Sequence, residues 1–250
     1  LLVQALPFML ILYLLFPRVS GPLWGLPQDA YSALSGLSEQ MSPGSISSLI
    51  QSGAIAFRSQ FAGEVPEKAD LYWRGPVFDD YDGLTWRARP PAGGPARADP
   101  LIEARGQVHA YTSILEAHNQ RWLLALDVPT RLPPDSRLAP TLEVLAREPL
   151  RVRSRVSFVS ALDYRASVAE AAAILQQSLA LPAQFNPRTR ALAAEWQSLP
   201  PREIAEAALT KFRHEAFYYT LQPPLLGPDA MDEFLFTTRR GFCEHYASAF

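Results

Sequence analysis

The sequence is poor in cysteine, and this sets a first limit on its fold. Cys243 is the only cysteine among the 250 residues, so a disulfide framework within the chain is impossible. An excess of charge of one sign is lacking as well, because 23 basic residues stand against 25 acidic ones and leave a net charge of -2. This balance argues against a surface that binds nucleic acid or an anionic membrane.

Apolar residues and prolines, in contrast, are plentiful. Apolar residues make up 48% of the chain, enough to bury a sizeable core and too many for a disordered tail. Proline accounts for 23 of the 250 residues, against a usual share of about 5%, which excludes a long helical bundle or a coiled coil. The chain opens inside an apolar run at Leu1 and stops at Phe250 inside a helical pattern, so we expect a segment of a longer protein.

The first residues have the composition of a membrane helix. Only Gln4 and Pro7 interrupt the apolar run that opens the chain. As a helix, this run would extend about 24 Å, against roughly 30 Å for a bilayer core. We expect a clipped transmembrane helix at 1–17, ended by Pro17, with a signal peptide or a buried core helix as alternatives. Residues 18–53, rich in Ser, Gly and Pro, are typical of a linker.

From residue 54 to residue 164, apolar residues alternate with polar ones. A period of two is typical of half-buried antiparallel strands, and turns rich in Gly, Pro and Asp separate the runs. We therefore expect an antiparallel β-rich domain over 54–164, a sandwich or a barrel of about seven strands. The runs cover 55–61, 71–74, 84–89, 107–116, 122–127, 142–147 and 152–160.

Three aspartates, two tryptophans and two histidines in this domain are weak candidates for a functional site. The aspartates lack the spacing and the terminal glutamate of a calcium-binding loop, so we expect solvated turn residues. The tryptophans are expected in the core of the sheet. The histidines have no partner at the spacing of metal ligands and are expected to be ordinary surface or sheet residues. These residues are Asp79, Asp80, Asp82, Trp73, Trp86, His109 and His118.

A helical pattern replaces the alternation over 165–250. A capping box that begins at Ser167 predicts a helix as far as residue 179. Asn186 as the N-cap and Pro187 as the first helical residue predict a second helix, and Pro201 opens a third helix with an apolar stripe. The remaining elements are an extended segment over 217–221 and a helical turn over 231–236 that Asp229 caps.

Cys243 is the chemically informative residue. Gly241 breaks the preceding structure, and we expect a new helix to begin at or near Cys243 with Tyr246, Ala247 and Phe250 on its buried side. A thiol at a helix start meets unpaired N–H groups and the positive end of the helix dipole. These groups favour a thiolate and can stabilise a tetrahedral oxyanion. Cys243 is therefore a candidate nucleophile, the alternative being a buried structural cysteine.

The sequence shows no clear base for this nucleophile. His245 follows Cys243 closely and points to another face of the same helix, and nothing marks His214 in the preceding helix. A zinc site built from Cys243, Glu244 and His245 would need consecutive helical residues to converge, which helix geometry forbids. We expect the base and its orienting acid to lie outside these 250 residues.

The segment over 241–250, GFCEHYASAF, resembles the cysteine motif of the bacterial transglutaminase-like, papain-like superfamily. Other segments resemble one branch of it, the TgpA-type membrane-anchored transglutaminases, in the same order along the chain. The resemblance covers essentially the whole chain, so it is more specific than the cysteine motif alone. The segments are FPR (16–18), SGPLW (20–24), AFR (56–58), LYWRGP (71–76), YDGLTW (81–86), WLLALD (122–127), NPRTR (186–190), FYYTL (217–221) and PPLLG (223–227).

The resemblance implies a fold and a chemistry. The fold class is α+β: a clipped N-terminal transmembrane helix, an antiparallel β-rich periplasmic domain and, over 165–250, the helical front half of a papain-like transglutaminase core. The chemistry is acyl transfer, in which a cysteine thiolate attacks a glutamine carboxamide, ammonia leaves and an amine takes the acyl group. Of the catalytic triad, only the nucleophile, Cys243, carries over. The family's histidine and aspartate lie beyond Phe250, so this chain alone is expected to be inactive.

The sequence is compatible with three functions. The first is a protein-glutamine gamma-glutamyltransferase in the bacterial inner membrane, with its soluble part in the periplasm. Its partners would be a protein that donates glutamine and an amine acceptor, without nucleic acid and without a metal or organic cofactor. The second is a cysteine peptidase or amidase, in which water replaces the amine. The third is a non-catalytic periplasmic scaffolding module.

Overall fold

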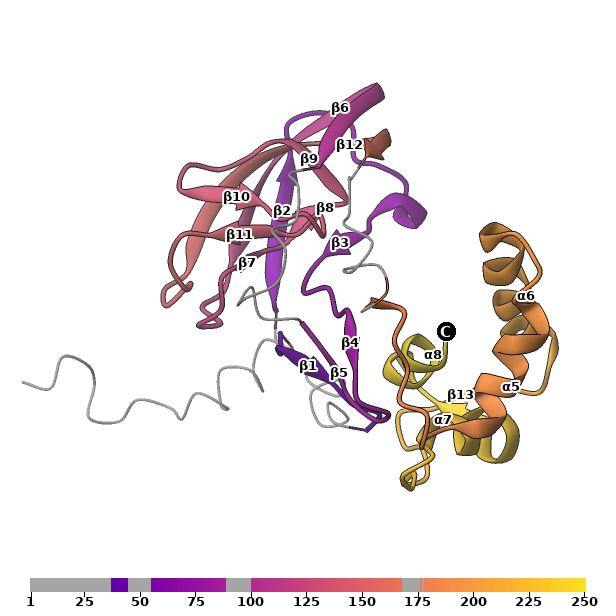
Figure 1. The fold of residues 1–250 in the computed structure, drawn as a ribbon. Helices are drawn as coiled ribbons and strands as arrows, with labels where there is room; N and C mark the ends of the chain where they lie inside the picture. Colours follow the sequence, from indigo (N-terminus) through magenta and orange to yellow (C-terminus); the bar gives the residue numbers. More distant parts are fainter. Residues whose placement is uncertain (1–36, 45–54, 89–99, 168–175, 177) are drawn as a thin grey trace, which may run out of the picture.

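The computed structural model describes residues 37–44, 55–88, 100–167, 176 and 178–250. Antiparallel sheets fill the first part of this fold and helices most of the last part, so its class is α+β (Figure 1). The predicted transmembrane helix at 1–17 lies outside the described residues. Within the described ranges, no helix has the length and apolar character that a membrane span requires.

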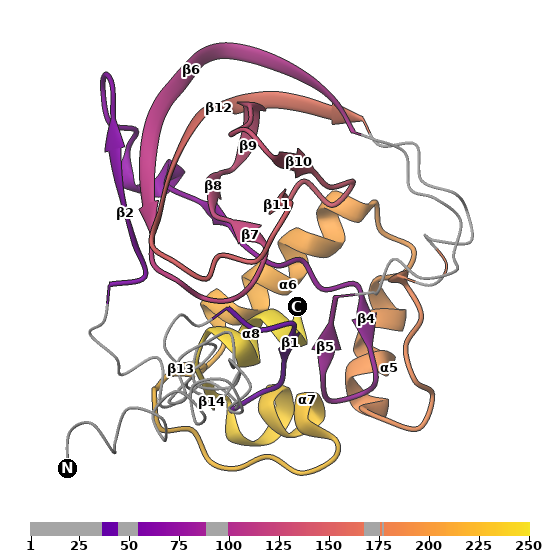
Figure 2. The same cartoon turned by 90° about the vertical axis from the view of Figure 1, so that its left-hand side faces the viewer.

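The largest sheet has four antiparallel strands in the order β2–β6–β12–β9. Its centre is a ribbon of two long strands, β6 and β12, which curve together over the domain (Figure 2). The register of this ribbon shifts between Ala161 and Asp163, opposite Gly106 with its φ of 63°, and such a bulge increases the local twist and bend. The four strands are β2 (Phe57–Phe61), β6 (Leu101–Leu115), β9 (Val128–Arg131) and β12 (Ser154–Ser167).

Smaller sheets cover the other side of the core. Tyr111 lies at the centre, where its ring stacks on Phe158 at 5.3 Å and meets the edge of Trp73 at 5.5 Å. Its hydroxyl also accepts the backbone N–H of Leu126 at 2.6 Å, so this one side chain joins both layers. The strands of the smaller sheets are β3 (Trp73–Arg74), β7 (Trp122–Leu123), β8 (Ala125–Leu126), β10 (Ser136–Leu138) and β11 (Val144–Ala146).

The main strands of this domain agree with the sequence pattern. β2, β6 and β12 confirm the predicted runs, although β6 begins earlier, at Leu101, and β12 continues to Ser167. Trp73 packs in the core as predicted. The prediction for His118 is wrong, because its ring is only 4% exposed and lies outside any strand, with Nδ1 accepting the backbone N–H of Gln120 at 3.1 Å.

A separate sheet, in the order β1–β5–β4, lies between the large sheet and the helices (Figures 1 and 2). β1 (Gln40–Met41) comes from the predicted linker and pairs Met41 with Trp86. The turn after β1 is fixed by a hydrogen bond of 2.8 Å between the hydroxyls of Ser42 and Thr85. Part of the segment with a linker composition is therefore an ordered strand. The other two strands are β4 (Asp80–Tyr81) and β5 (Trp86–Arg87).

The last third of the chain packs through aromatic side chains. Phe217, Phe234 and Tyr246 meet with ring centres 5.1 to 6.1 Å apart, and Phe212 joins this cluster. Most predicted elements are present, whereas the predicted helix over 167–179 lies largely outside the described residues. The elements are α5 (Pro187–Trp196), α6 (Pro201–His214), β13 (Tyr218–Tyr219), α7 (Ala230–Glu233), the π-helical turn η2 (Phe234–Thr238), β14 (Arg240–Gly241) and α8 (Cys243–Ala249).

Asn186 precedes α5 as predicted, but its side chain does not cap the helix. Asp232 of α7 takes that role, since its carboxylate accepts the backbone N–H groups of Arg188 at 2.9 Å and Thr189 at 2.7 Å. Asp229 does not cap α7 with its side chain either, because its carboxylate accepts the backbone N–H of Asn186 at 2.7 Å. Asn186 and Asp229 thus occupy the predicted N-cap positions, but neither side chain makes the cap hydrogen bond, because each serves a tertiary contact instead.

Asn186 instead joins the β4–β5 hairpin to the helices. Its side-chain amide donates to the carbonyl of Gly83 at 2.9 Å, and its amide oxygen accepts the backbone N–H of Met231 at 2.9 Å. Gly83 has a φ of 109°, and a Cβ there would lie 2.2 Å from the ring of Phe185. The hydroxyl of Tyr81 donates to the same carbonyl at 2.6 Å, and burial raises the pKa of Tyr81 to about 12. The hairpin therefore docks closely on the helical part.

Candidate active site

Cys243 is the first residue of α8, as the sequence predicts, and its side chain is exposed. The preceding residue, Phe242, is extended, with a φ of -124° and a ψ of -169°. Its side chain is completely buried. The thiol of Cys243 is therefore exposed directly after a residue whose side chain is fully buried.

The chain that leads to Cys243 is held by a parallel strand pair. β14 lies beside β13, with Tyr219 opposite Gly241, and the backbone N–H of Thr220 donates to the carbonyl of Gly241 at 2.8 Å. A Cβ on Gly241 would lie 2.6 Å from the Cβ of His245. A side chain at position 241 would push α8 away from the strand, so the glycine permits the close approach that places Cys243.

His245 occupies the inner side of the same helical turn. Its ring is 1% exposed and packs against Phe242 and Phe234 with ring centres 4.7 and 5.6 Å apart. Nδ1 accepts the backbone N–H of Phe242 at 3.5 Å, a long version of the bond by which a third helical residue satisfies the N-cap. Burial lowers the pKa of His245 below its usual value. The ring is therefore part of the buried packing of this turn, whereas the thiol of Cys243 is exposed.

Glu244 occupies another side of this turn, and its contact with a distant part of the chain was not predicted from the sequence. Its side chain is 2% exposed, and its carboxylate accepts the backbone N–H of Gly44 at 3.0 Å. The only local signal is a charged residue directly beside a candidate nucleophile. Nothing in the sequence pattern indicates that a backbone N–H from the predicted linker, that of Gly44, donates to this carboxylate.

The buried face of α8 differs from the predicted one. Glu244, His245 and Ser248 are buried, whereas Ala247 and Phe250 are exposed and Tyr246 is partly buried. The prediction holds for Tyr246, whose ring packs against Phe212, Phe217 and Phe234. It is wrong for Ala247 and Phe250, because the polar side chains of Glu244 and His245 face the β1 turn and the strand β14 instead.

The other residues weighed as partners of Cys243 lie apart from this arrangement. His214 is the last residue of α6 and is exposed. In the parts of the chain that the structure describes, no group of three His, Cys, Asp or Glu side chains is arranged to hold a metal ion. The site as described therefore consists of an exposed thiol on a firmly held helical turn.

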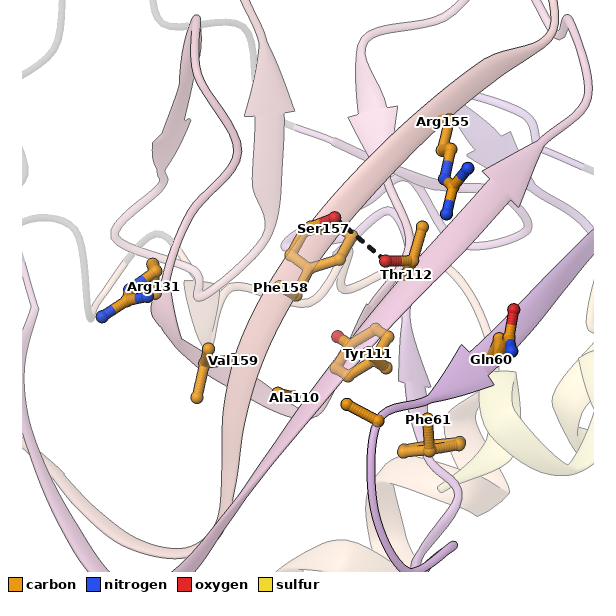
Figure 3. A pocket seen from close by; sticks show the side chains of 11 residues that line it. Gln60, Phe61, Ala110, Tyr111, Thr112, Arg131, Arg155, Ser157, Phe158 and Val159 are labelled. Atoms are coloured by element: carbon orange, nitrogen blue, oxygen red, sulfur yellow. Dashed lines mark hydrogen bonds between the residues drawn. The ribbon is translucent and has the colours of Figure 1, made fainter.

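A hollow on the large sheet is a different kind of feature (Figure 3). It has a volume of about 420 Å³ and is formed by β2, β6, β9 and β12. Arg131 and Arg155 lie at opposite ends of it, and the hydroxyls of Thr112 and Ser157 between them share a hydrogen bond of 3.0 Å. The described residues that line it include no carboxylate, cysteine or histidine, so they offer no base that would activate the hydroxyls of Thr112 and Ser157.

The chain is similar to known proteins along both its β-rich domain and the helical residues that follow it. The protein-glutamine gamma-glutamyltransferase of Pseudomonas aeruginosa (strain PAO1) is 41% identical over 260 residues, which include 100% of this chain and 37% of that protein. The chain thus spans little more than a third of that relative. Two crystal structures of the periplasmic domain of TgpA from Pseudomonas aeruginosa, the second bound to ethylmercury, match with a TM-score of 0.78 each, at 37% and 36% identity.

These structural matches cover 86% and 85% of this chain, and 74% and 76% of the crystallised chains. A family model described as the TgpA N-terminal domain matches residues 1–167. This match ends where β12 ends, at Ser167, and it includes well over half of the 250 residues. The chain therefore belongs to the TgpA N-terminal domain family.

Proposed function

We propose that the complete protein is a protein-glutamine gamma-glutamyltransferase and that Cys243 is its nucleophile. One observation carries this proposal: the single thiol of the chain is exposed at the start of α8, in a sequence that is 41% identical along its whole length to an enzyme of that name.

The reaction follows from the chemistry of a thiolate. The sulfur attacks the carboxamide carbon of a glutamine side chain, a tetrahedral oxyanion forms, and the carbon–nitrogen bond breaks. Ammonia leaves with a proton from the general acid, and a thioester remains. A primary amine then attacks the thioester and loses a proton, the carbon–sulfur bond breaks, and an amide bond replaces the thioester. One ammonia is released for each new amide bond, and the thiolate is regenerated without any cofactor.

The residues of this chain supply the nucleophile and hold it. His245 is buried with Nδ1 engaged, so it does not serve as the base. We assign the base and its orienting acid to a histidine and an aspartate that follow α8 in the complete protein, as the resemblance to the papain-like superfamily implies.

The proposal extends to the organisation of the protein. We assign residues 1–17 to a membrane anchor, 18–53 to a linker that contains β1, 54–164 to a β-rich domain and 165–250 to the front of a transglutaminase-like, papain-like core. The described part would lie in the periplasm beside the bacterial inner membrane, and its partners would be a glutamine-donor protein and an amine acceptor. Support comes from the relatives described as a periplasmic domain and from the family match that ends at residue 167.

The test uses the full-length protein with casein as glutamine donor and a fluorescent primary amine as acceptor. Amine incorporation is expected to fall by about 10³-fold or more in Cys243→Ala, because the covalent step is lost. In a separate titration, the 250-residue chain should bind one equivalent of ethylmercury at its single thiol, and its Cys243→Ala variant none. Retained incorporation in Cys243→Ala would refute the nucleophile. Glutamate formation without amine incorporation by the native protein would identify a hydrolase instead.

A further inference from the structure

The turn over 42–44 contacts α8, the helix that begins with the proposed nucleophile, although the two lie far apart in the sequence. The backbone N–H of Gly44 donates to Oε2 of Glu244 at 3.0 Å, over a separation of 200 residues. Glu244 is 2% exposed, and a buried carboxylate is costly unless hydrogen bonds replace its hydration. The bond is therefore a specific contact between two distant parts of the chain.

The turn is held in place from its other side. Gly44 has a φ of 90°, a conformation that glycine adopts without steric cost. Ser42 bonds to Thr85 at 2.8 Å, and β1 pairs with β5. The hairpin that contains β5 is in turn bonded to the helices through Asn186. The N–H of Gly44 thus reaches Glu244 from a supported strand.

The first turn of α8 is fixed on two sides, and Cys243 faces a third. Consecutive helical residues point about 100° apart. On one side, the ring of His245 packs against Phe242 at 4.7 Å. On another side, Glu244 accepts the bond from Gly44. The side chain of Cys243 is exposed between these contacts, so the direction of its thiol depends on both of them.

We propose that Glu244 is a positioning residue for Cys243, and that the turn over 42–44 is the element through which the β1–β5–β4 sheet holds the nucleophile. This inference rests on the proposed function. Acyl transfer requires the sulfur to approach the carboxamide carbon in a defined direction, and a misplacement of about 1 Å costs about 10²-fold in rate. Loss of the contact between Gly44 and Glu244 therefore lowers kcat and leaves substrate binding unchanged.

The experiment measures kcat and KM of the full-length protein with carbobenzoxy-glutaminyl-glycine as donor and hydroxylamine as acceptor. Glu244→Ala is expected to lower kcat by about 10- to 100-fold, with KM within about twofold of the native value. Glu244→Gln keeps an oxygen acceptor for Gly44 and is expected to restore kcat to within about threefold. Thr85→Val keeps the shape of the side chain but removes its hydrogen bond to Ser42, so it should also lower kcat. In combination with Glu244→Ala, it should cause no further loss of kcat.

Glu143→Gln is the matched control. Glu143 is also a buried carboxylate, and it accepts the backbone N–H of Val77 at 2.8 Å within the β-rich domain. This variant is expected to lower the unfolding temperature and leave kcat unchanged. Alkylation of Cys243 by iodoacetamide, which needs no fixed orientation, should proceed at the native rate in Glu244→Ala.

Two results would overturn the proposal: native kcat in Glu244→Ala, or a loss in Glu244→Gln as large as in Glu244→Ala. If Glu244→Ala does not fold, Thr85→Val decides alone, because native kcat in that variant contradicts a role for the turn. Activity that survives Cys243→Ala would refute the proposed nucleophile instead, whatever the Glu244 variants do.

Discussion

The side-chain amide of Asn186 donates to the backbone carbonyl of Gly83 at 2.9 Å, although 103 positions separate the two residues. The same side chain accepts the backbone N–H of Met231, so it bonds to the hairpin and to α7 at once. A single buried amide thereby links the N-terminal family domain to the helices that precede Cys243. The stability of this junction is open to direct measurement.

Replacement of Asn186 by alanine should weaken the junction. Asn186→Ala leaves the N–H of Met231 without this partner, whereas the carbonyl of Gly83 keeps the hydroxyl of Tyr81. An unpaired buried group costs about 1–3 kcal/mol, and each lost hydrogen bond about 0.5–1.5 kcal/mol. We expect the free energy of unfolding in urea to fall by about 3 kcal/mol. Asn119→Ala is the control, because Asn119 has a similar left-handed φ of 55°; it should cost only about 1 kcal/mol. Equal losses would mean that backbone strain, not hydrogen bonding, dominates.

A methyl group at position 83 should separate the hairpin from the helices. In Gly83→Ala, the new Cβ would lie 2.2 Å from the ring of Phe185 at a φ of 109°. Gly106→Ala introduces the milder left-handed strain of a φ of 63° in open surroundings, so the double-mutant cycle below separates the clash from the backbone strain. We expect Gly83→Ala to lower the unfolding free energy by about 2 kcal/mol more than Gly106→Ala. A double-mutant cycle with Phe185→Ala should show coupling; additive effects would exclude the clash.

The start of α5 should depend on a carboxylate outside the helix. Asp232 accepts the backbone N–H groups of Arg188 and Thr189 and the hydroxyl of Thr189. Loss of a helix cap costs about 0.5–2 kcal/mol, so Asp232→Ala is expected to lower the unfolding free energy by about 2 kcal/mol. Hydrogen exchange should accelerate at the amides of Arg188 and Thr189. Unchanged exchange there would show that the cap is dispensable.

The stability of the fold should fall in mild acid. Burial lowers the pKa values of His118 and His245 from the usual 6.5, so the unfolded chain binds protons on these rings at a higher pH than the folded chain does. Their contribution to stability is complete above about pH 6.5 and is lost as the pH falls toward the folded-state pKa values. We expect His118→Gln and His245→Gln each to reduce the slope of unfolding free energy against pH below about pH 6.5. A double variant with the native slope would contradict this origin.

The sequence carried enough information for the longer strands and for the start of the last helix. β2, β6 and β12 present alternate residues to one core, so their pattern is local. The start of α8 at Cys243 follows from Gly241 and the residues beside it. β1 and β4 contain two residues each, too few to show any period.

The contacts around the candidate site could not be predicted from local sequence patterns. The partners of Glu244 and Asn186 are backbone groups 200 and 103 positions away, and neither a carboxylate nor an amide indicates by itself where a distant N–H or carbonyl lies. Asn before Pro correctly predicted the start of α5 at Asn186, but it gave no sign that the side chain bonds to the hairpin and to α7 instead of the helix. Hydrophobic ranking failed on α8 for a related reason: its buried positions are polar and depend on tertiary partners.

The bond between Gly44 and Glu244 also has an evolutionary consequence. If the helical part were joined to a foreign β domain, Glu244 would lose the backbone N–H that the β1 turn donates to its buried carboxylate, and the cost of that lost hydrogen bond would fall on the helix that bears Cys243. Recombination that exchanges one unit alone is therefore expected to destabilise the helix of the candidate nucleophile. Selection for activity favours the inheritance of both units as one piece.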